Sequence, residues 1–409
     1  MELLISAGQV LPGPSGQRIS DGAVLIRDRV LVAVAGRAEV EAQASADAVS
    51  VSFPAGTVLP GLVNCHVHLA FDAGPDPAAA VQAADDTTLL LGMAGRALEL
   101  LDCGVTTARD LGDRGGLAMR LRDAIAGGLL PGPRILAAGA PLTVPGGHCW
   151  YLGGEVDGEQ SIREMVRRNA RDGADLIKVM VSGGQTTPGG AAMWESQFGA
   201  DEVRIVVDEA HREGLRVAAH AHGTEGIAAA VAAGVNTVEH CTFLADGGVF
   251  RPSEDVAQQL AGAGIHVCPT TSPNWRRLAQ FIGPERAEQL QGRLRWLDDR
   301  GVRLVFGTDA GLPGSVFGDV VGSLGLYRHL GFPAERIVEM ATVDAAAALG
   351  LADHLGRLGP GMSADVVVVD GDPLVDLDAL GRVRLVVARG RAHVPASAAL
   401  RAGGSGTDR

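Results

Sequence analysis

Lysine is almost absent from this sequence. Among its 409 residues, 35 are basic, and all of these are arginine except Lys178. Lys178 stands inside an apolar run, DLIKVMV, where an unpaired ammonium would be costly to bury. A chain that otherwise uses arginine has kept lysine at one position, which makes Lys178 a candidate functional residue.

Other shortages exclude whole classes of protein. No run approaches the roughly 18–20 uninterrupted apolar residues of a membrane-spanning helix, and MELLISAGQVLPG lacks the pattern of a signal peptide. The net charge of −13 argues against nucleic-acid binding, which needs clustered basic residues. The five cysteines are scattered without CxxC pairs, so we expect a protein of the reducing cytoplasm.

The middle of the chain alternates between two patterns. Short apolar runs are separated by stretches with apolar residues at helical spacing. The eight runs are GLVNCHVH, GVTTARD, RILAAG, DLIKVMVSGG, LRVAAHAHG, VNTVEHC, IHVCPTT and VRLVFGTDAG. Eight strand–helix units predict an α/β fold, a (β/α)8 TIM barrel, with its active site at the C-terminal ends of the strands.

The two ends of the chain have short alternating strands instead. They include LLISAGQVL, GAVLIRD and VLVAVAG near the start, and ADVVVVDG and VRLVVARGRAH near the end. We expect residues 1–59 and 358–400 to form one small β-sandwich, with the barrel of residues 60–357 inserted between them. Residues 401–409 are predicted to be a disordered tail.

Histidines collect at the ends of the predicted barrel strands. His66 and His68 are two residues apart, so on a strand both rings would point the same way. A second such pair, His220 and His222, ends LRVAAHAH, and His240 ends VNTVEH. An HxH pair alone is weak evidence, because chance pairs and structural histidines are common.

Asp309 ends the eighth run, VRLVFGTD. Taken alone it could be a turn or N-cap residue before AGLP. A barrel, however, brings its strand ends together around one axis. Histidines from three strand ends and an aspartate from a fourth therefore predict a metal site.

Three roles are open for Lys178. It could be a Schiff-base nucleophile or a buried ion-pair partner. Its neutral amine could also react with carbon dioxide to form a carbamate, whose two oxygens could bridge cations about 3.5–4 Å apart. Arginine stays protonated and cannot form a carbamate. The carbamate therefore explains why lysine persists at this position.

In these motifs the sequence resembles the amidohydrolase superfamily, in its binuclear branch with a carboxylated lysine. The resemblance covers nearly the whole chain, including PGLVNCHVHL, GVTTARDLG, AAHAHG, EHC, GTDAG and GPGMSADVVVVDGDPL. The segments PGGHCWYLGGEVDG and KVMVSGGQTTPGG are similar to those of the imidazolonepropionase-like and Xaa-Pro dipeptidase (prolidase)-like group.

The resemblance implies two divalent metal ions, with zinc expected, and N6-carboxylation of Lys178 by carbon dioxide. The implied metal ligands are His66, His68, Lys178, His220, His240 and Asp309. The paired histidines of the first strand would hold the more buried ion, which Asp309 also contacts. The histidines of the fifth and sixth strands would hold the second ion, and Lys178 would bridge the two.

The loop after the third strand supplies substrate contacts in this group. The resemblance therefore implies contacts from His148 and Tyr151, with Trp150 as a wall, and makes His222 a substrate-binding or catalytic residue. The alternative is a glycine-rich loop whose aromatic residues merely pack. One departure is Phe317, which stands where relatives commonly carry histidine.

The implied activity is hydrolysis of an amide or peptide C–N bond, of the dipeptide or N-acyl amino acid type, by a hydroxide that bridges the metals. Asp309 would transfer the proton to the leaving nitrogen and His222 would help to hold the oxyanion. The same machinery serves cyclic amide or imidazolone-type ring hydrolases, deaminases, and lactone or carbamate ester hydrolases. Deaminases of the superfamily generally lack a lysine ligand, so Lys178 argues against that alternative.

One further alternative is a non-catalytic assembly protein built on this fold. Such a protein typically loses metal ligands, whereas all six implied ligands are present here. The expected partner is a small amide or peptide substrate, and a homo-oligomer is left open.

Three cysteines stand beside candidate residues, namely Cys65, Cys149 and Cys241. We expect their side chains to point away from the neighbouring histidine and to pack as small core residues.

Overall fold

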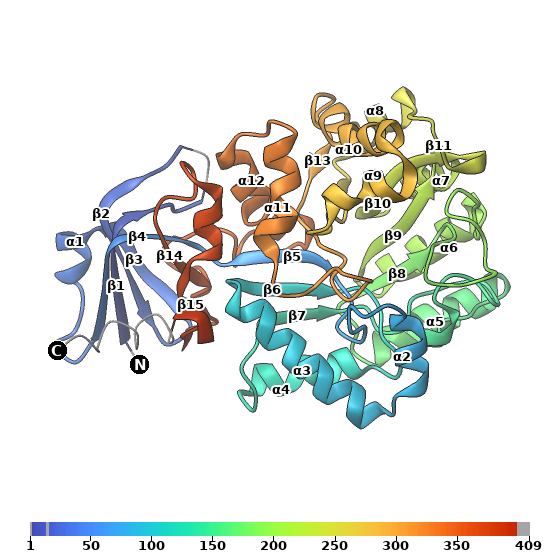
Figure 1. The fold of residues 1–409 in the computed structure, drawn as a ribbon. Helices are drawn as coiled ribbons and strands as arrows, with labels where there is room; N and C mark the ends of the chain where they lie inside the picture. The colour runs from blue at the N-terminus through green and yellow to red at the C-terminus, as the bar shows by residue number, and fades with distance from the viewer. Residues whose placement is uncertain (1, 14–15, 399–409) are drawn as a thin grey trace.

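The computed structural model describes residues 2–13 and 16–398. The predicted disordered tail 401–409, and the last two residues of the predicted segment 358–400, lie outside the described residues. A β-rich part, which holds both ends of the described chain, stands beside a larger part built of strands and helices (Figure 1). No helix among the described residues is long and apolar enough to cross a membrane.

Eight strands form the centre of the larger part, and each corresponds to one of the predicted apolar runs. They are β5 (Leu62–Val67), β6 (Val105–Asp110), β7 (Arg134–Ala137), β8 (Leu176–Met180), β9 (Arg216–Gly223), β10 (Thr237–Ala245), β12 (His266–Cys268) and β13 (Arg303–Leu304). They pair in parallel within two groups, β5–β6–β7 and β8–β9–β10–β12–β13, and the short β11 (Val249–Phe250) is added to β10.

Backbone hydrogen bonds also cross both gaps between these two groups. Cys65 N donates to Phe306 O (2.9 Å) after β13, and Leu142 N, after β7, donates to Lys178 O (2.8 Å) in β8. The (β/α)8 barrel predicted from the sequence is therefore the fold of the larger part. Parallel strands bring their C-terminal ends to one face of such a barrel, which is where side chains can converge.

Helices surround these strands (Figure 1). The longer ones are α3 (Asp86–Asp102), α4 (Leu117–Gly127), α5 (Gly158–Arg171), α6 (Ala200–Arg212), α7 (Thr224–Ala233), α8 (Glu254–Ala263), α10 (Pro284–Asp298) and α11 (Val320–His329). The shorter ones are α1 (Arg37–Glu41), α2 (Pro77–Ala83), α9 (Leu278–Ile282), α12 (Ala334–Met340) and α13 (Val343–Ala348). In α5, Ile162, Met165 and Val166 are buried at helical spacing, which packs that face onto the barrel.

The smaller part is one mixed seven-stranded sheet in the order β16-β15-β14-β4-β1-β2-β3. Its strands are β1 (Glu2–Val10), β2 (Ile19–Arg27), β3 (Val30–Gly36), β4 (Val49–Pro60), β14 (Val366–Asp370), β15 (Val383–Ala388) and β16 (Arg391–His393). The two chain ends meet where β4 pairs with β14. Ile5, Val24 and Val387, which come from both ends of the chain, share one buried core, which is consistent with the predicted β-sandwich.

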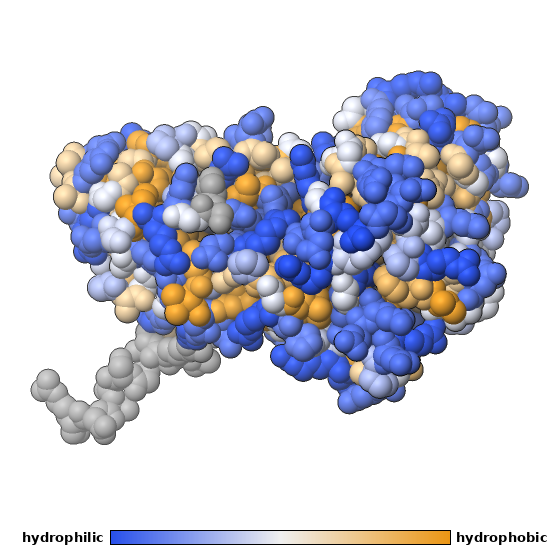
Figure 2. Space-filling view, turned by 90° about the horizontal axis from the view of Figure 1, so that it is seen from above, coloured by the Kyte–Doolittle hydropathy of each residue, from blue (hydrophilic) through white to orange (hydrophobic). Residues whose placement is uncertain are grey.

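One strand of this sheet was not predicted. β4 runs through the predicted limit between residues 59 and 60 and continues toward the barrel. The domain limits therefore stay predictions, although both chain ends do join one sheet. Figure 2 shows the molecule from above with hydrophilic residues over much of this face and hydrophobic residues in smaller groups.

Candidate metal centre and active site

The predicted metal-ligand residues converge at the C-terminal ends of the barrel strands. Their side chains border one cavity of about 120 Å³, except His66, which is buried and contacts His68 of the lining. The lining residues are His68, Phe71, His148, Cys149, Lys178, Met180, Gln185, Thr186, Met193, His220, His222, His240, Asp309 and Leu312. The barrel topology thus places in one cavity side chains that lie more than two hundred residues apart in the sequence.

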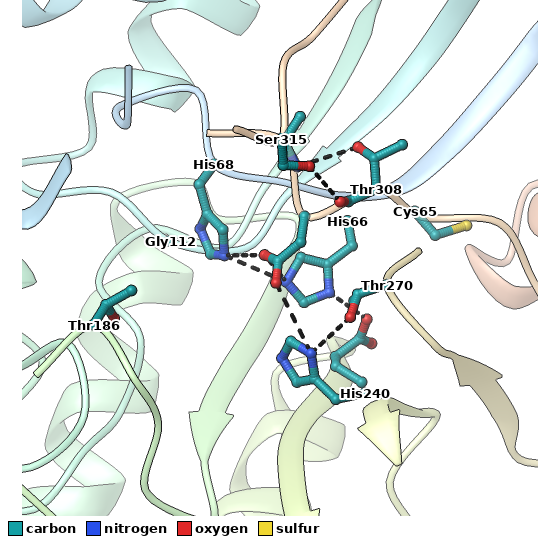
Figure 3. A network of polar contacts seen from close by, with 12 residues as sticks. Cys65, His66, His68, Gly112, Thr186, His240, Thr270, Thr308 and Ser315 are labelled. Carbon is teal, nitrogen blue, oxygen red and sulfur yellow. Dashed lines mark hydrogen bonds and ion pairs between the residues drawn. The ribbon is translucent and has the colours of Figure 1, made fainter. Parts of the chain in front are cut away.

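A first cluster joins β5 to the segment after β13. The Nε2 atoms of His66 and His68 lie 3.3 Å apart, and Figure 3 shows these two rings pointing toward each other. Asp309 Oδ1 lies 3.2 Å from His66 Nε2 and 3.3 Å from His68 Nε2. Three donor atoms this close together can hold one cation.

A second cluster joins β9 and β10. The ring centroids of His220 and His240 lie 4.5 Å apart, and the ring of His222 stacks on His240 at 4.4 Å. The three rings could hold a second cation together. His222, for which the resemblance implied a substrate-binding or catalytic role, therefore lies as close to this cluster as the two implied ligands do.

Hydrogen bonds determine which ring nitrogens are free. His66 Nδ1 donates to Glu239 Oε2 (2.8 Å) and His220 Nε2 donates to Gly183 O (3.0 Å), because a carboxylate and a carbonyl only accept. The nitrogens that remain available to a metal ion are then His66 Nε2 and His220 Nδ1. A neighbouring acceptor that fixes the histidine tautomer is the usual support of a metal ligand.

The hydrogen bonds of His222 favour a similar state. The Thr242 hydroxyl donates to the His222 carbonyl (3.2 Å), so its oxygen accepts from His222 Nδ1 (2.9 Å). The lone pair of His222 then lies on Nε2. The predicted oxyanion contact would need an N–H at that atom, whereas a ligand or base needs the lone pair.

Burial favours the neutral form of the histidines that line the cavity. It lowers the pKa of His148 to about 4 and that of His222 to about 3, and it lowers the pKa values of His68, His220 and His240 as well. For Asp309, burial raises the pKa, but His66 and His68 outweigh burial and hold it well below its usual value. At neutral pH the cavity therefore presents neutral rings and one carboxylate, which are the forms that bind metal ions.

Lys178 lies at this cavity with no partner for its amine. The residue is 1% exposed, and no hydrogen bond reaches Nζ from any described residue. Burial lowers the pKa of Lys178 to about 8, although Glu239 and Asp309 act in the opposite direction. An unpartnered amine does not fit the ion-pair alternative. It fits an amine that gains its partners when it is carboxylated and metal ions are bound.

The backbone is strained where the site is built. His240 (φ 65°), Thr270 (φ 55°) and Asp309 (φ 56°) all lie in the left-handed region, which non-glycine residues rarely adopt. The Thr270 hydroxyl and His240 Nδ1 also share a hydrogen bond of 2.8 Å. Such conformations cost about 1–3 kcal/mol each and persist where the surrounding structure enforces them, typically at functional sites.

The predicted substrate loop is only partly at the cavity. His148 lines it, with its ring 4.6 Å from that of His220. Tyr151 lies behind this lining, where its hydroxyl donates to Cys149 Sγ (3.7 Å), and Trp150 is 41% exposed. The structure therefore brings one of the three predicted contact residues to the cavity.

The expectation for the cysteines was right for two of them and wrong for Cys149. Cys65 and Cys241 are buried in the core. Cys149 lines the cavity with Sγ 3.7 Å from His148 Nε2. Its backbone has φ 57° in a loop, so the alternation of side chains along a strand does not apply.

Sequence reasoning missed Glu239 and Arg109. Both are buried in barrel strands, and Glu239 directly contacts His66. The available signal was the same as for Lys178, namely a charged residue inside an apolar run. Phe317, the noted departure, is buried and is not among the residues that line the cavity.

Fold and site together define a barrel enzyme with two clusters of metal-type ligands at its mouth. Residues 57–392 match the model of the amidohydrolase family, and the chain belongs to this family. The predicted resemblance to the amidohydrolase superfamily and to its imidazolonepropionase and prolidase group is confirmed, and the protein is a hydrolase.

Three relatives illustrate the likeness. The chain is 28% identical to ochratoxinase of Aspergillus niger, over 91% of this chain and 82% of that protein. It is 28% identical to imidazolonepropionase of Anaeromyxobacter sp. (strain K), over 87% and 86%. A solved structure of a Xaa-Pro dipeptidase with methionine bound in its active site is 29% identical, with a TM-score of 0.83, and the alignment covers 96% of this chain and all of that one.

Proposed function

We propose that this protein hydrolyses an amide or peptide C–N bond, of the dipeptide or N-acyl amino acid type, in a site that holds two divalent metal ions and a carboxylated Lys178. The observation that carries the proposal is the unpartnered Nζ of Lys178 in a cavity bordered by two clusters of histidines. Similarity to a protein named as a Xaa-Pro dipeptidase supports the choice of bond.

The donor atoms suit such ions. His66, His68 and Asp309 would hold one, and His220 and His240 the other, with His222 close enough to contribute. Carboxylation of Lys178 requires its neutral amine to attack carbon dioxide and release one proton, which gives an anion with two oxygens. Divalent ions held here would supply Lewis acidity, which lowers the pKa of water so that hydroxide is available near neutral pH and which polarises the substrate carbonyl.

The chain's own residues would handle protons and position the substrate. Asp309 is ionised and lies at the cavity, so it can accept a proton from the attacking water and pass it to the leaving nitrogen. His148 presents a neutral imidazole to the same space, where it can hydrogen bond to a polar group of the substrate. Zinc as the metal and the cytoplasm as location stay predictions, and a homo-oligomer stays open.

A substrate panel tests the proposed reaction. Protein reconstituted with zinc and bicarbonate is assayed against dipeptides, N-acyl amino acids, cyclic imides, lactones and carbamate esters. Cleavage of the first two classes with the highest kcat/KM supports the proposal. A preference for the cyclic imides would contradict it. Ring hydrolysis is the main alternative reaction, because the chain is similar to imidazolonepropionase.

Variants of Lys178 test the proposed carboxylation. Lys178→Ala and Lys178→Arg should both lose orders of magnitude in rate, and acetate or propionate should partly restore the alanine variant by filling the space of the missing anion. Borohydride trapping in the presence of substrate, without rescue by carboxylates, would indicate a Schiff base instead. Full activity of Lys178→Arg would refute both chemical roles.

A further inference from the structure

A buried ionic network lies directly under the two ligand clusters. Arg109 in β6 donates through Nη2 to Glu239 Oε1 in β10 (2.7 Å), and Thr237 Oγ1 donates to the same oxygen (2.5 Å). The other carboxylate oxygen, Oε2, accepts from His66 Nδ1 in β5 (2.8 Å). All four side chains are buried, so solvent cannot replace any of these contacts.

The network fixes the chemical state of His66. Both oxygens of Glu239 are occupied by donors, and its ion pair with the guanidinium of Arg109 (2.7 Å) keeps the carboxylate in its charged form. An ionised carboxylate can only accept, so the proton of the His66 ring must be on Nδ1. The nitrogen left for a metal ion is then Nε2, which faces His68 Nε2 and Asp309 Oδ1.

The network also ties together strands that are not neighbours. β5 pairs with β6, whereas β10 lies between β9 and β12. Arg109 bridges this gap, because its Nε donates to Cys65 O in β5 (2.7 Å) while Nη1 donates to Thr237 Oγ1 in β10 (3.0 Å). Glu239 is followed directly by His240 of the second cluster. The Arg109–Glu239 ion pair thus connects the first ligand cluster, through His66, to the second, through His240.

We propose that Arg109 and Glu239 are positioning residues, which set the tautomer of His66 and hold the first ligand cluster in register with the second. A buried ion pair kept only for folding would not need its second carboxylate oxygen on a candidate ligand. This inference rests on the proposed metal site, and it concerns residues that touch neither the substrate nor the ions.

Paired variants separate positioning from folding. Removing Glu239 alone would leave the guanidinium of Arg109 buried and unpaired, which by itself could unfold the protein. We therefore compare two double variants, in each of which Arg109→Met is combined with a substitution of Glu239. Arg109→Met/Glu239→Met has no acceptor for His66 Nδ1, whereas Arg109→Met/Glu239→Gln retains an amide oxygen that can accept.

Zinc affinity of the metal-stripped full-length chain is measured by competition with a chromophoric chelator. The methionine pair should bind its tighter zinc ion about 10–100-fold more weakly than the parent protein, the range seen when such partners of metal ligands are removed. The glutamine pair should recover part of that loss. In metal-free protein labelled with 15N-histidine, one ring should change its tautomer in the methionine pair and keep it in the glutamine pair.

Glu209→Gln serves as a matched control. Glu209 in α6 is equally buried and accepts from Arg163 (2.7 Å) and Arg167 (2.6 Å), but it does not line the cavity. It should lose thermal stability and retain zinc affinity. Equal zinc affinity in both double variants, or an equal loss in Glu209→Gln, would overturn the inference. Absence of zinc binding by the parent protein would instead refute the proposed function.

Discussion

Replacing Lys178 by methionine should stabilise the metal-free protein while it abolishes activity. The ammonium of Lys178 is buried without a hydrogen-bond partner, and the pKa of the residue falls from 10.5 to about 8 on folding. One pKa unit corresponds to about 1.4 kcal/mol, so holding this lysine protonated at pH 7 costs on the order of 3 kcal/mol of folding free energy. Methionine has a similar volume and no charge, so it should remove most of that cost without leaving a cavity.

The pH dependence follows from the same shift. The unfolded chain holds its proton up to about pH 10.5, whereas the folded chain releases it above about pH 8. Between these values the unfolded state binds more protons, so the parent protein gains stability as pH rises. The advantage of Lys178→Met should therefore be full below pH 8 and shrink toward pH 10.5.

Urea denaturation of metal-stripped protein in carbon dioxide-free buffer, at pH 7 and at higher pH, measures this difference. A methionine variant that is less stable than the parent at pH 7 would refute the reasoning, because the ammonium would then have a favourable partner. The predicted loss of activity is tested separately, by assaying the zinc-loaded Lys178→Met variant, which should lose orders of magnitude in rate. The lysine would thus be kept for function at a cost in stability.

Three further predictions follow from the site and the fold. A Cβ on Gly184 would collide with the ring of His148, so Gly184→Ala should lower kcat/KM by about tenfold or more with unchanged zinc content; normal kinetics would show that the ring position does not matter. Elemental analysis of protein grown with ample zinc should approach two ions per chain, and a firm value of one after bicarbonate treatment would favour a mononuclear site. Truncation after residue 357 removes β14, which pairs with β4, so the product should be insoluble or unfolded; a soluble and active product would contradict this arrangement.

Much of the barrel and of its site could be predicted from local sequence. A parallel strand buried on both faces is a short apolar run whatever it packs against, so the eight runs were recognisable one by one. His68, His240 and Asp309 could be placed at the mouth because barrel topology brings every strand end to the same face. The lone lysine stood out because charge is costly in an apolar run.

Other features were decided only by tertiary structure. The contact of Glu239 with His66, and its link to Arg109, joins strands that are distant in the sequence and are not neighbours in the barrel. Cys149 faces the cavity and Trp150 faces solvent because a loop with left-handed residues turns them, which no periodic pattern encodes. The hydrophobic periodicity of a segment indicates which of its faces is buried, but not which atoms that face contacts. Which atoms meet across the barrel depends on the closure of the whole ring, and that is a property of the folded chain alone.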